Sequence, residues 1–196
     1  MKRGYAPAIT GFVIWLRHTP IATLAFAAAA LLAWAGAPAG TAAEAAASRT
    51  ACAGQNDGSA PLRAQERAML CLVNEARRAR GLAPLAAARP LAKAADHKSA
   101  DILRCDEFSH EACDREFTYW MTRFGYQGCM EGENIAWGSG GLGTPHSIFR
   151  AWMHSTGHRE NILGDYEEIG IGLRSGKLEG YGGAHVWTQE FGARSC

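Results

Sequence analysis

Histidine side chains are the first candidates for chemistry in this sequence, because imidazole can bind a metal ion or transfer a proton near neutral pH. His154 and His158 are four residues apart, a spacing that places two imidazoles on one face of a helix and could bind zinc. Gly157 lies between them and is expected to end the helix, which leaves one capping and one exposed histidine as the alternative. His97 falls inside an expected helix, and we interpret it as structural.

The sequence contains no recognisable serine-hydrolase or zinc-protease motif. Both G-x-S-x-G and H-E-x-x-H are absent. Ser155 is close in sequence to His154 and His158, but no acidic residue is placed by spacing to orient either histidine. Residues 138–143 match G-x-G-x-x-G, yet no parallel βαβ unit surrounds them, so we interpret them as a surface loop. The motifs therefore leave open whether the protein is an enzyme.

The N-terminal segment has the order of features found in secretory signal peptides. Basic residues precede an apolar run at 21–34, and small residues follow it up to Ala43. The run is shorter than the roughly 20 residues that span a bilayer, which argues against the alternative, an uncleaved membrane anchor. We therefore predict a signal peptide at 1–43, or up to Ala47, and a secreted protein that diffuses away or stays at the cell envelope.

The chain beyond the predicted signal is long enough for one domain with a hydrophobic core. We interpret residues 44–59 as a flexible lead-in and residues 60–196 as the folded domain. This part has no second apolar run long enough to span a membrane. The 20 basic and 19 acidic residues nearly balance, and no concentrated basic segment indicates binding to nucleic acid.

All six cysteines lie beyond the predicted signal, and an even number in an exported domain indicates disulfides. No C-x-x-C pair occurs, which argues against a metal-binding or catalytic thiol. Spacing alone does not determine the connectivity. We expect the pairs Cys52–Cys71, Cys105–Cys113 and Cys129–Cys196. The first would tie the lead-in to a helix, the second would close a short loop, and the third would hold the C-terminus.

Hydrophobic periodicity predicts four helices and three strands, without internal repeats. The helices are expected at 59–80 with Ser59 as N-cap and Gly81 as stop, at 89–105, at 114–124, and from Thr144-Pro145 to about Gly157, before a short turn at 158–163. The strands are expected at 130–137, 169–174 and 185–191, the last two joined by a Gly-rich turn at 180–183. Gly170 and Gly172 share one face of their strand, where we expect another element to pack closely. This order is not an alternating βαβ pattern, so we predict an α+β fold with an antiparallel sheet packed by helices.

Seven short segments occur in an order that is specific when they are taken together. They are LCLVNEARRARGLAPL (70–85), AADHKSADI (94–102), FSH (108–110), GENIAWG (132–138), AWMHSTGHRENIL (151–163), IGIGL (169–173) and VWTQEFG (186–192). This set resembles the CAP superfamily, the SCP-like extracellular domain of cysteine-rich secretory and plant pathogenesis-related proteins, and is most similar to its bacterial branch. The resemblance implies a three-layer α-β-α sandwich with a small, mainly antiparallel sheet.

The resemblance also implies a cleft lined by two histidines and two acidic residues. His110 matches the first histidine, Glu133 matches one acid and His158 matches the second histidine. Ser155 stands where many eukaryotic members of the family have the second acid, a glutamate. Other residues considered for that place are Glu160, Asn161 and Glu190.

Two neutral imidazoles and a carboxylate can hold Zn²⁺ or another divalent cation and leave one position open to water or substrate. Our leading hypothesis is a secreted CAP-domain protein whose cleft at His110, Glu133 and His158 binds a divalent metal or a small ligand, lipids included, with an envelope partner as a further option. One alternative is a hydrolase of peptide, cell-wall or nucleic-acid substrates, in which the same groups act as general acid and base. The other is a structural or interaction protein whose cleft is a stabilising hydrogen-bond network.

Overall fold

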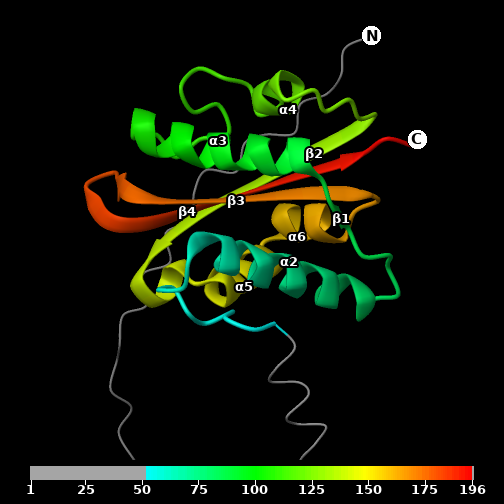
Figure 1. The fold of residues 1–196 in the computed structure, drawn as a ribbon, viewed down its shortest axis with the longest axis horizontal. Helices are drawn as coiled ribbons and strands as arrows, with labels where there is room; N and C mark the ends of the chain where they lie inside the picture. The colour runs from blue at the N-terminus through cyan, green and yellow to red at the C-terminus, as the bar shows by residue number, and fades with distance from the viewer. Residues whose placement is uncertain (1–51, 196) are drawn as a thin grey trace, which may run out of the picture. The chain divides into compact units, whose positions relative to one another are not determined.

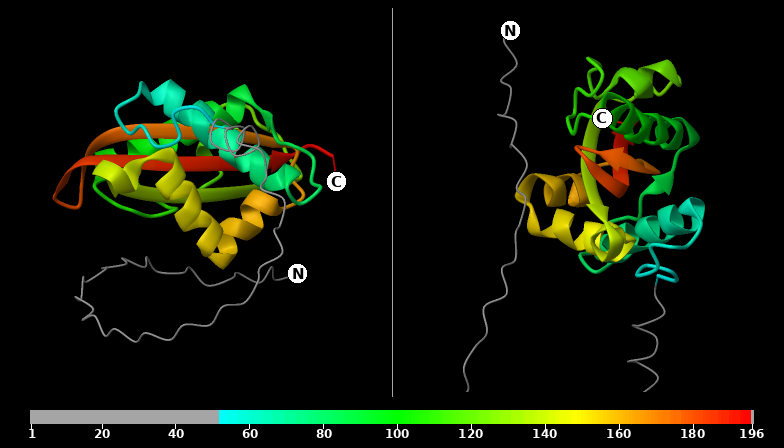
Figure 2. Two further views of the ribbon diagram at one scale, coloured as in Figure 1. Left: turned by 90° about the horizontal axis from the view of Figure 1, so that it is seen from below. Right: turned by 90° about the vertical axis from the view of Figure 1, so that its left-hand side faces the viewer.

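A four-stranded sheet forms the middle layer of the structure, with helices on both of its faces (Figures 1 and 2). The computed structural model describes residues 52–195. The strands are β1 (Ala86–Ala87), β2 (Met130–Ser139), β3 (Glu168–Leu178) and β4 (Tyr181–Ala193), in the spatial order β1-β3-β4-β2. β1 is parallel to β3 and the other neighbours are antiparallel, so the predicted three-layer α+β sandwich is confirmed.

The helices are divided between the two outer layers (Figure 1). Helices α2 (Leu62–Arg78), α5 (Pro145–His154) and α6 (Thr156–Leu163) cover one face of the sheet. Helices α3 (Arg89–Cys105) and α4 (Tyr119–Arg123) cover the other, and the short 3₁₀ helix η1 (Gly140–Gly143) joins β2 to α5. Across residues 52–195, none of the helices combines the length and apolarity needed to cross a bilayer.

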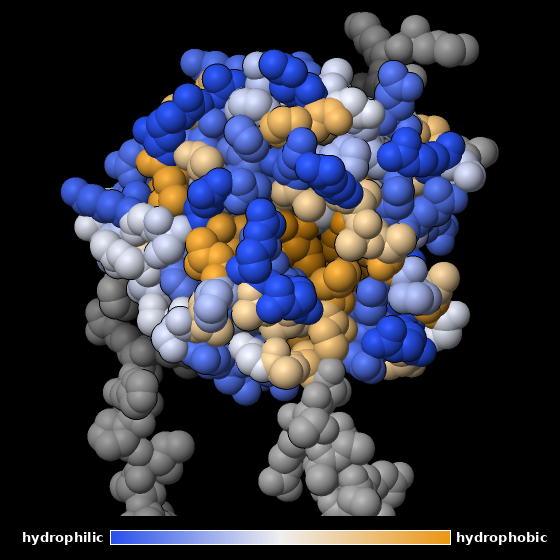
Figure 3. Space-filling view, in the orientation of Figure 1, coloured by the Kyte–Doolittle hydropathy of each residue, from blue (hydrophilic) through white to orange (hydrophobic). Residues whose placement is uncertain are grey.

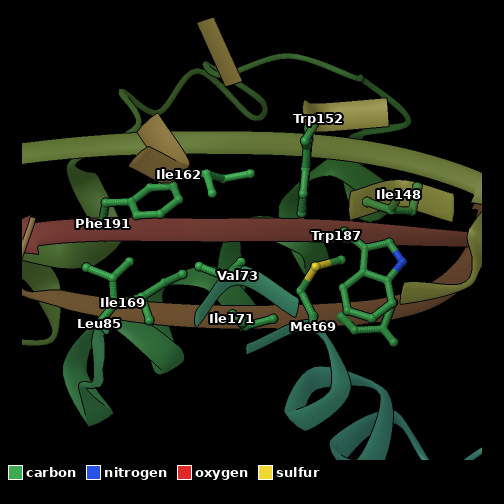
Figure 4. Packing of buried hydrophobic residues seen from close by; sticks show 11 residues of the cluster. Met69, Val73, Leu85, Ile148, Trp152, Ile162, Ile169, Ile171, Trp187 and Phe191 are labelled. Atoms are coloured by element: carbon green, nitrogen blue, oxygen red, sulfur yellow. The ribbon is translucent and has the colours of Figure 1, made fainter. Parts of the chain in front are cut away.

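The largest cluster of buried side chains lies between the sheet and α2, α5 and α6 (Figure 4). Met69 of α2 and Trp152 of α5 meet Trp187 of β4 there, and each is at most 1% exposed. The indole N–H of Trp187 donates to the carbonyl of Gly143 (2.9 Å), and that of Trp152 donates to the carbonyl of Ile135 (3.2 Å). Both aromatic residues therefore bury their rings without leaving a polar atom unbonded.

Two smaller clusters fill the opposite side of the sheet. Ile102 of α3 packs with Ile135 of β2 and Val186 of β4. Met121 packs with Leu91, and Phe117, Trp120 and Phe124 lie against the same cluster. His97 also lies against these aromatics, with its ring centroid 4.5 Å from that of Trp120.

The expected helix at 89–105 is confirmed with the predicted bounds, and the helix after Thr144-Pro145 begins as predicted. The Oγ1 of Thr144 accepts the backbone N–H of Ser147 (3.3 Å), which satisfies one of the free donors of the first turn. The start predicted at Ser59 is wrong, because Pro61 directly precedes α2 and Ser59 instead bonds to Asp57.

Two helix bounds in the second half of the chain differ from prediction. The helix expected at 114–124 shrinks to α4, because Cys113 and Asp114 adopt left-handed backbone angles (φ 62° and 55°) that a right-handed helix cannot contain. The stop expected at Gly157 is also wrong. Ser155 is extended (φ −96°, ψ 128°) and separates α5 from α6, which contains Gly157 and the segment expected to be a turn.

The two expected disulfides among the described cysteines are present. Cys52 is bonded to Cys71 of α2, and Cys105 at the end of α3 is bonded to Cys113. The third expected pair includes Cys196, which lies outside the described residues, as do the predicted signal peptide and residues 44–51.

The hairpin of β3 and β4 turns through Glu179 and Gly180, both with positive φ (48° and 87°). Leu178 is paired with Tyr181, so the turn has two central residues, one position earlier than the Gly-rich turn that we predicted. Both strands also extend beyond their predicted ends.

The outer edge of β3 is covered by charged side chains where β1 no longer pairs with it. Arg174 binds Asp96 of α3 (2.5 Å), and Arg63 binds Glu66 of α2 (2.9 Å). Burial raises the pKa of Glu66, while Arg63 and the backbone N–H of Leu173 act in the opposite direction. The space-filling view shows apolar side chains in a hollow between α2 and α3, with hydrophilic side chains around and across it (Figure 3). The charged side chains of these two ion pairs protect the edge of β3 from pairing with other chains.

Close packing of α3 on β3 confirms the role expected of the two strand glycines. A Cβ built on Gly170 would lie 2.0 Å from the carbonyl carbon of Leu91, and one on Gly172 would lie 2.3 Å from that of Ala95. The helix backbone therefore rests directly on the strand. This approach lets the hydroxyl of Ser99 reach that of Thr188 on β4 (2.8 Å).

We expect Gly172→Ala to lower the free energy of unfolding by about 1–3 kcal/mol, because the added methyl forces α3 away from the sheet. Chemical denaturation would measure the change. Gly157→Ala is the matched control, since a Cβ there meets nothing within 4 Å and alanine favours the helix. Equal stability of Gly172→Ala and the unmodified protein would show that the helix–strand contact is not this tight.

Candidate functional site

The candidate site lies at the free edge of β2, between the two helical layers (Figure 2). β2 is the last strand of the sheet, and α6 lies beside it in the right-hand view. Successive side chains of a strand point to opposite faces. Glu133 thus faces α3, while Asn134 faces α6, so groups from both layers can meet around this edge.

His110 and Glu133 are in direct contact. Nδ1 of His110 lies 2.6 Å from Oε1 of Glu133, whose side chain is only 2% exposed, whereas that of His110 is 51% exposed. A carboxylate at this position accepts the Nδ1–H and fixes both the tautomer and the orientation of the ring. The ring therefore presents its other nitrogen, Nε2, for binding.

Lys98 of α3 supports this pair from inside the protein. Its Nζ donates to the backbone carbonyl of His110 and lies 4.0 Å from Oε1 of Glu133. The Lys98 side chain is 3% exposed, so the ammonium is almost fully removed from water. A buried charge of this kind is tolerated when an opposite charge and hydrogen bonds compensate it.

Glu190 brings a second carboxyl group to Glu133. The two residues face each other in the pairing of β2 with β4, and Glu190 is completely buried. Burial is the main reason that the pKa of Glu190 is raised well above its ordinary value. The negative charge of Glu133 and a hydrogen bond with Glu133 raise it further, whereas the positive charge of Lys98 lowers it. Neither oxygen of Glu190 accepts a hydrogen bond from another group of the described residues, nor does Oε2 of Glu133. A proton on Glu190 can pair one of its oxygens with Oε2 of Glu133, which leaves the other Glu190 oxygen without a partner among the described residues.

His158 approaches the same edge from α6. Its Nδ1 lies 2.9 Å from Oγ of Ser155, the residue that precedes the helix. Burial, and then the charge of His110, lower the pKa of His158. His158 is therefore neutral at pH 7, which is the form that binds metals and accepts protons.

A network of amide side chains holds α6 against β2. Asn134 donates to the carbonyl of His158 (3.1 Å) and to Oε1 of Gln189 (3.1 Å). Asn161 of α6 donates to the carbonyl of Glu133 (3.1 Å) and to Oδ1 of Asn134 (2.9 Å). These bonds fix the helix that carries His158 relative to the strand that carries Glu133.

The ring nitrogens left for a ligand at this edge are Nε2 of His110 and Nε2 of His158. Both imidazoles use Nδ1 for contacts within the protein. Throughout residues 52–195, no group of three or more His, Cys, Asp and Glu side chains is placed to hold a metal ion. Glu133, expected from the sequence as a third ligand, instead contacts His110 with one oxygen.

Sequence reasoning missed Lys98 and did not place Glu190. The sequence does not indicate a role for Lys98 in the site, because lysine side chains on helices are ordinarily exposed to solvent. Glu190 was one of three residues considered for the second acid, and only the register of β2 and β4 places it there. Of the other two, Asn161 donates to the Glu133 backbone and Glu160 is exposed on α6.

A shallow, open depression of about 650 Å³ lies elsewhere, lined by residues of the 113–123 segment. None of His110, Glu133 and His158 borders it. Arg115, a cation in its lining, is already bonded to Asp101 (2.8 Å). We therefore place the candidate site at the β2 edge, where the polar groups converge.

The sandwich resembles solved structures of bacterial proteins, one of which is described as containing an SCP domain. An outer surface protein from Borrelia burgdorferi aligns with a TM-score of 0.60 and 17% identity, over 69% of this chain and 96% of that one. An extracellular protein containing an SCP domain from Bacillus anthracis aligns with a TM-score of 0.55 and 23% identity, over 70% and 45%. These similarities establish the fold.

Sequence comparison establishes the family. Residues 70–191 match the model of the CAP family, described as the cysteine-rich secretory protein family, and the chain belongs to this family. A curated relative, the uncharacterized protein YkwD of Bacillus subtilis, is 36% identical over 138 residues, which cover 68% of this chain. The matched region covers 49% of that relative, so the chain corresponds to about half of its length.

Proposed function

We propose that this protein is an exported CAP-domain binding protein whose site at the β2 edge takes a divalent cation, with Zn²⁺ as the first candidate. His110 and His158 would bind the metal through Nε2, and solvent or a small ligand would complete the coordination. Zinc supplies a Lewis acid and an anchoring point for such a ligand. Export is supported by the predicted signal peptide and by the two disulfides, which persist in oxidising compartments.

The contact between Nδ1 of His110 and Oε1 of Glu133 carries this proposal. Histidines that bind metals usually donate their other ring N–H to a carboxylate or carbonyl. A buried carboxylate behind a half-exposed imidazole is the arrangement that this role requires. Glu133 then orients His110, and Lys98 fixes the backbone to which the ring is attached.

Calorimetric titration of Zn²⁺ into the metal-free protein tests the proposal. We expect one-to-one binding that is lost in His110→Ala/His158→Ala. His154→Ala is the matched control, because His154 is exposed at the end of α5, four residues before His158, and should leave binding unchanged. Failure of the folded, unsubstituted protein to bind would reject the metal site and favour a purely stabilising network.

Glu133→Gln tests the orienting role separately. The amide keeps the shape but loses the negative charge that holds Nδ1–H of His110. We expect the affinity for Zn²⁺ to fall by about 10–100-fold, the usual effect of removing such a partner. The same titration measures it, and unchanged affinity would show that Glu133 does not orient the ligand.

A hydrolase is the second candidate, because Oγ of Ser155 lies 2.9 Å from Nδ1 of a neutral histidine. A hydroxyl beside such a base can act as a nucleophile. The test is hydrolysis of ester and peptide substrates by the protein and by Ser155→Ala. Turnover that survives both Ser155→Ala and His158→Ala would rule out this site as its source.

A further inference from the structure

The Cys105–Cys113 disulfide closes the loop that carries His110. Cys105 is the last residue of α3, and Cys113 follows eight residues later. Between them, His110 is held by Lys98 through its carbonyl and by Glu133 through its ring. Movement of this short loop therefore changes the position of the histidine.

The two described disulfides differ in their access to solvent. Cys105 is exposed and Cys113 is partly exposed, whereas Cys71 is partly exposed and Cys52 is only 4% exposed. Thiol–disulfide exchange requires an incoming thiolate to reach one of the sulfur atoms. Cys105 is the most exposed of these four cysteines, so an incoming thiolate reaches this end of the Cys105–Cys113 disulfide most readily.

The position of Arg104 favours cleavage of the disulfide by attack on Cys105, with Cys113 as the sulfur that leaves. Its Nη2 lies 3.3 Å from Sγ of Cys113 and 2.7 Å from Oδ1 of Asp101, which holds the guanidinium in place. A positive charge beside a sulfur stabilises the thiolate that leaves during exchange. An attack on exposed Cys105 would therefore release Cys113 next to a cation.

Non-glycine residues with left-handed backbone angles lie within the Cys105–Cys113 loop and directly after it. Asp106, Cys113 and Asp114 have φ of 53°, 62° and 55°, and none of them is glycine. Aspartate enters this conformation fairly readily, but for a cysteine it has a cost that the surrounding structure must offset. The disulfide is one of the constraints, so its opening allows the backbone to relax.

We propose that Cys105–Cys113 is a thiol-exchange site that a dithiol reductant opens before Cys52–Cys71, and that its opening loosens the His110 loop. A thiolate of the reductant attacks Sγ of Cys105, the sulfur–sulfur bond breaks, and its electron pair leaves on Sγ of Cys113. The second thiol of the reductant then displaces Cys105 from the mixed disulfide. In total, the reductant loses two electrons and two protons and becomes a disulfide. Cys105 and Cys113 gain both and become thiols.

Limited reduction followed by rapid alkylation and peptide mass spectrometry tests the chemistry. We expect Cys105 and Cys113 to be alkylated at least about tenfold faster than Cys52 and Cys71. Arg104→Gln should slow this opening by about threefold. Arg78→Gln is the matched control, since Arg78 also pairs with an acidic residue three positions earlier at the end of a helix, but on the opposite face of the sheet. Equal rates for the two disulfides, or earlier opening of Cys52–Cys71, would overturn the proposal.

Hydrogen exchange tests the coupling to the loop. After selective reduction, and in Cys105→Ser/Cys113→Ser, amides of residues 106–113 should exchange faster while those of β4 stay protected. Unchanged exchange at 106–113 would overturn the coupling.

Effects on ligand binding rest on the proposed function. We expect Cys105→Ser/Cys113→Ser, which opens the loop without adding thiol ligands, to bind Zn²⁺ about tenfold more weakly. If the oxidised protein binds zinc and opening the disulfide leaves the affinity for zinc unchanged, the disulfide does not control the site. If the oxidised protein binds no zinc, the proposed function fails, while alkylation rates and hydrogen exchange still decide whether the exchange site exists.

Discussion

Lys98→Met should lower the free energy of unfolding by about 3–5 kcal/mol, the usual cost of removing one partner of a buried ion pair. The substitution keeps the length of the side chain but removes the cation 4.0 Å from Oε1 of Glu133 and the donor to the His110 carbonyl. In a domain of this size, thermal unfolding should begin roughly 10 °C lower. Calorimetry or circular dichroism would measure both quantities.

Lys93→Met is the matched control on the same helix. Lys93 is exposed and lies over the ring of Phe124 (5.5 Å to the centroid), so its loss should cost about 1 kcal/mol or less. The double variant Lys98→Met/Glu133→Gln should regain part of the lost stability, because the uncompensated carboxylate is gone. A double variant no more stable than Lys98→Met would show that the charge of Glu133 is not what Lys98 offsets.

Stability should fall as the pH rises above about 4.5, and Glu190→Gln should remove a large part of this dependence. Because the pKa of Glu190 is raised in the folded protein, mainly by burial and by Glu133, the folded state keeps a proton that the unfolded state loses near pH 4.5. The unfolded state then binds fewer protons, so higher pH favours unfolding. The loss is at most about 1.4 kcal/mol per pH unit for this one group, and it ends at the folded-state pKa.

Other groups titrate in the same range, so the comparison must be between variants. Glu66 and Glu131 have raised pKa values, mainly through burial, and act in the same direction as Glu190. His158 acts in the opposite direction, because its lowered pKa makes stability rise with pH up to about 6.5. Subtracting the Glu190→Gln profile from that of the unsubstituted protein isolates Glu190.

Urea denaturation between pH 4 and pH 8 provides these profiles. The unsubstituted protein should lose stability relative to Glu190→Gln as the pH rises above about 4.5, by at most about 1.4 kcal/mol per pH unit. Glu75→Gln is the control, since Glu75 is half exposed in a surface ion pair and should follow the unsubstituted protein. Parallel profiles for Glu190→Gln and the unsubstituted protein would mean that Glu190 does not hold its proton on folding.

Elements with strong local signals could be predicted from the sequence. The helix at Arg89–Cys105 and the start at Thr144-Pro145 depend on side-chain periodicity and on one capping contact within a few residues. Gly170 and Gly172 were expected to allow close packing, because two glycines on one face of a strand leave the backbone uncovered. The family resemblance also identified His110 and Glu133, which the structure brings into contact.

Local signals failed where distant contacts decide the conformation. Gly157 resembles a helix stop, but α6 continues through it because Asn134 and Asn161 hold this helix on β2. Asp114 begins no helix, because the disulfide and the packing of the loop keep its backbone left-handed. The two-residue strand β1 carries no pattern of its own, and it exists only through its pairing with β3.

The sequence by itself determined the α+β class, the order of most elements and the residues that could do chemistry. The structure confirmed two cysteine pairs that the sequence left as expectations. The tertiary structure alone decided that Lys98 is buried beside Glu133 and that Glu190 supplies the second carboxyl. Both facts depend on long-range geometry, namely the close approach of α3 to β3 and the register that pairs Glu133 with Glu190. Periodicity shows which face a residue occupies, but the charge of a buried group depends on which residues from distant segments surround it.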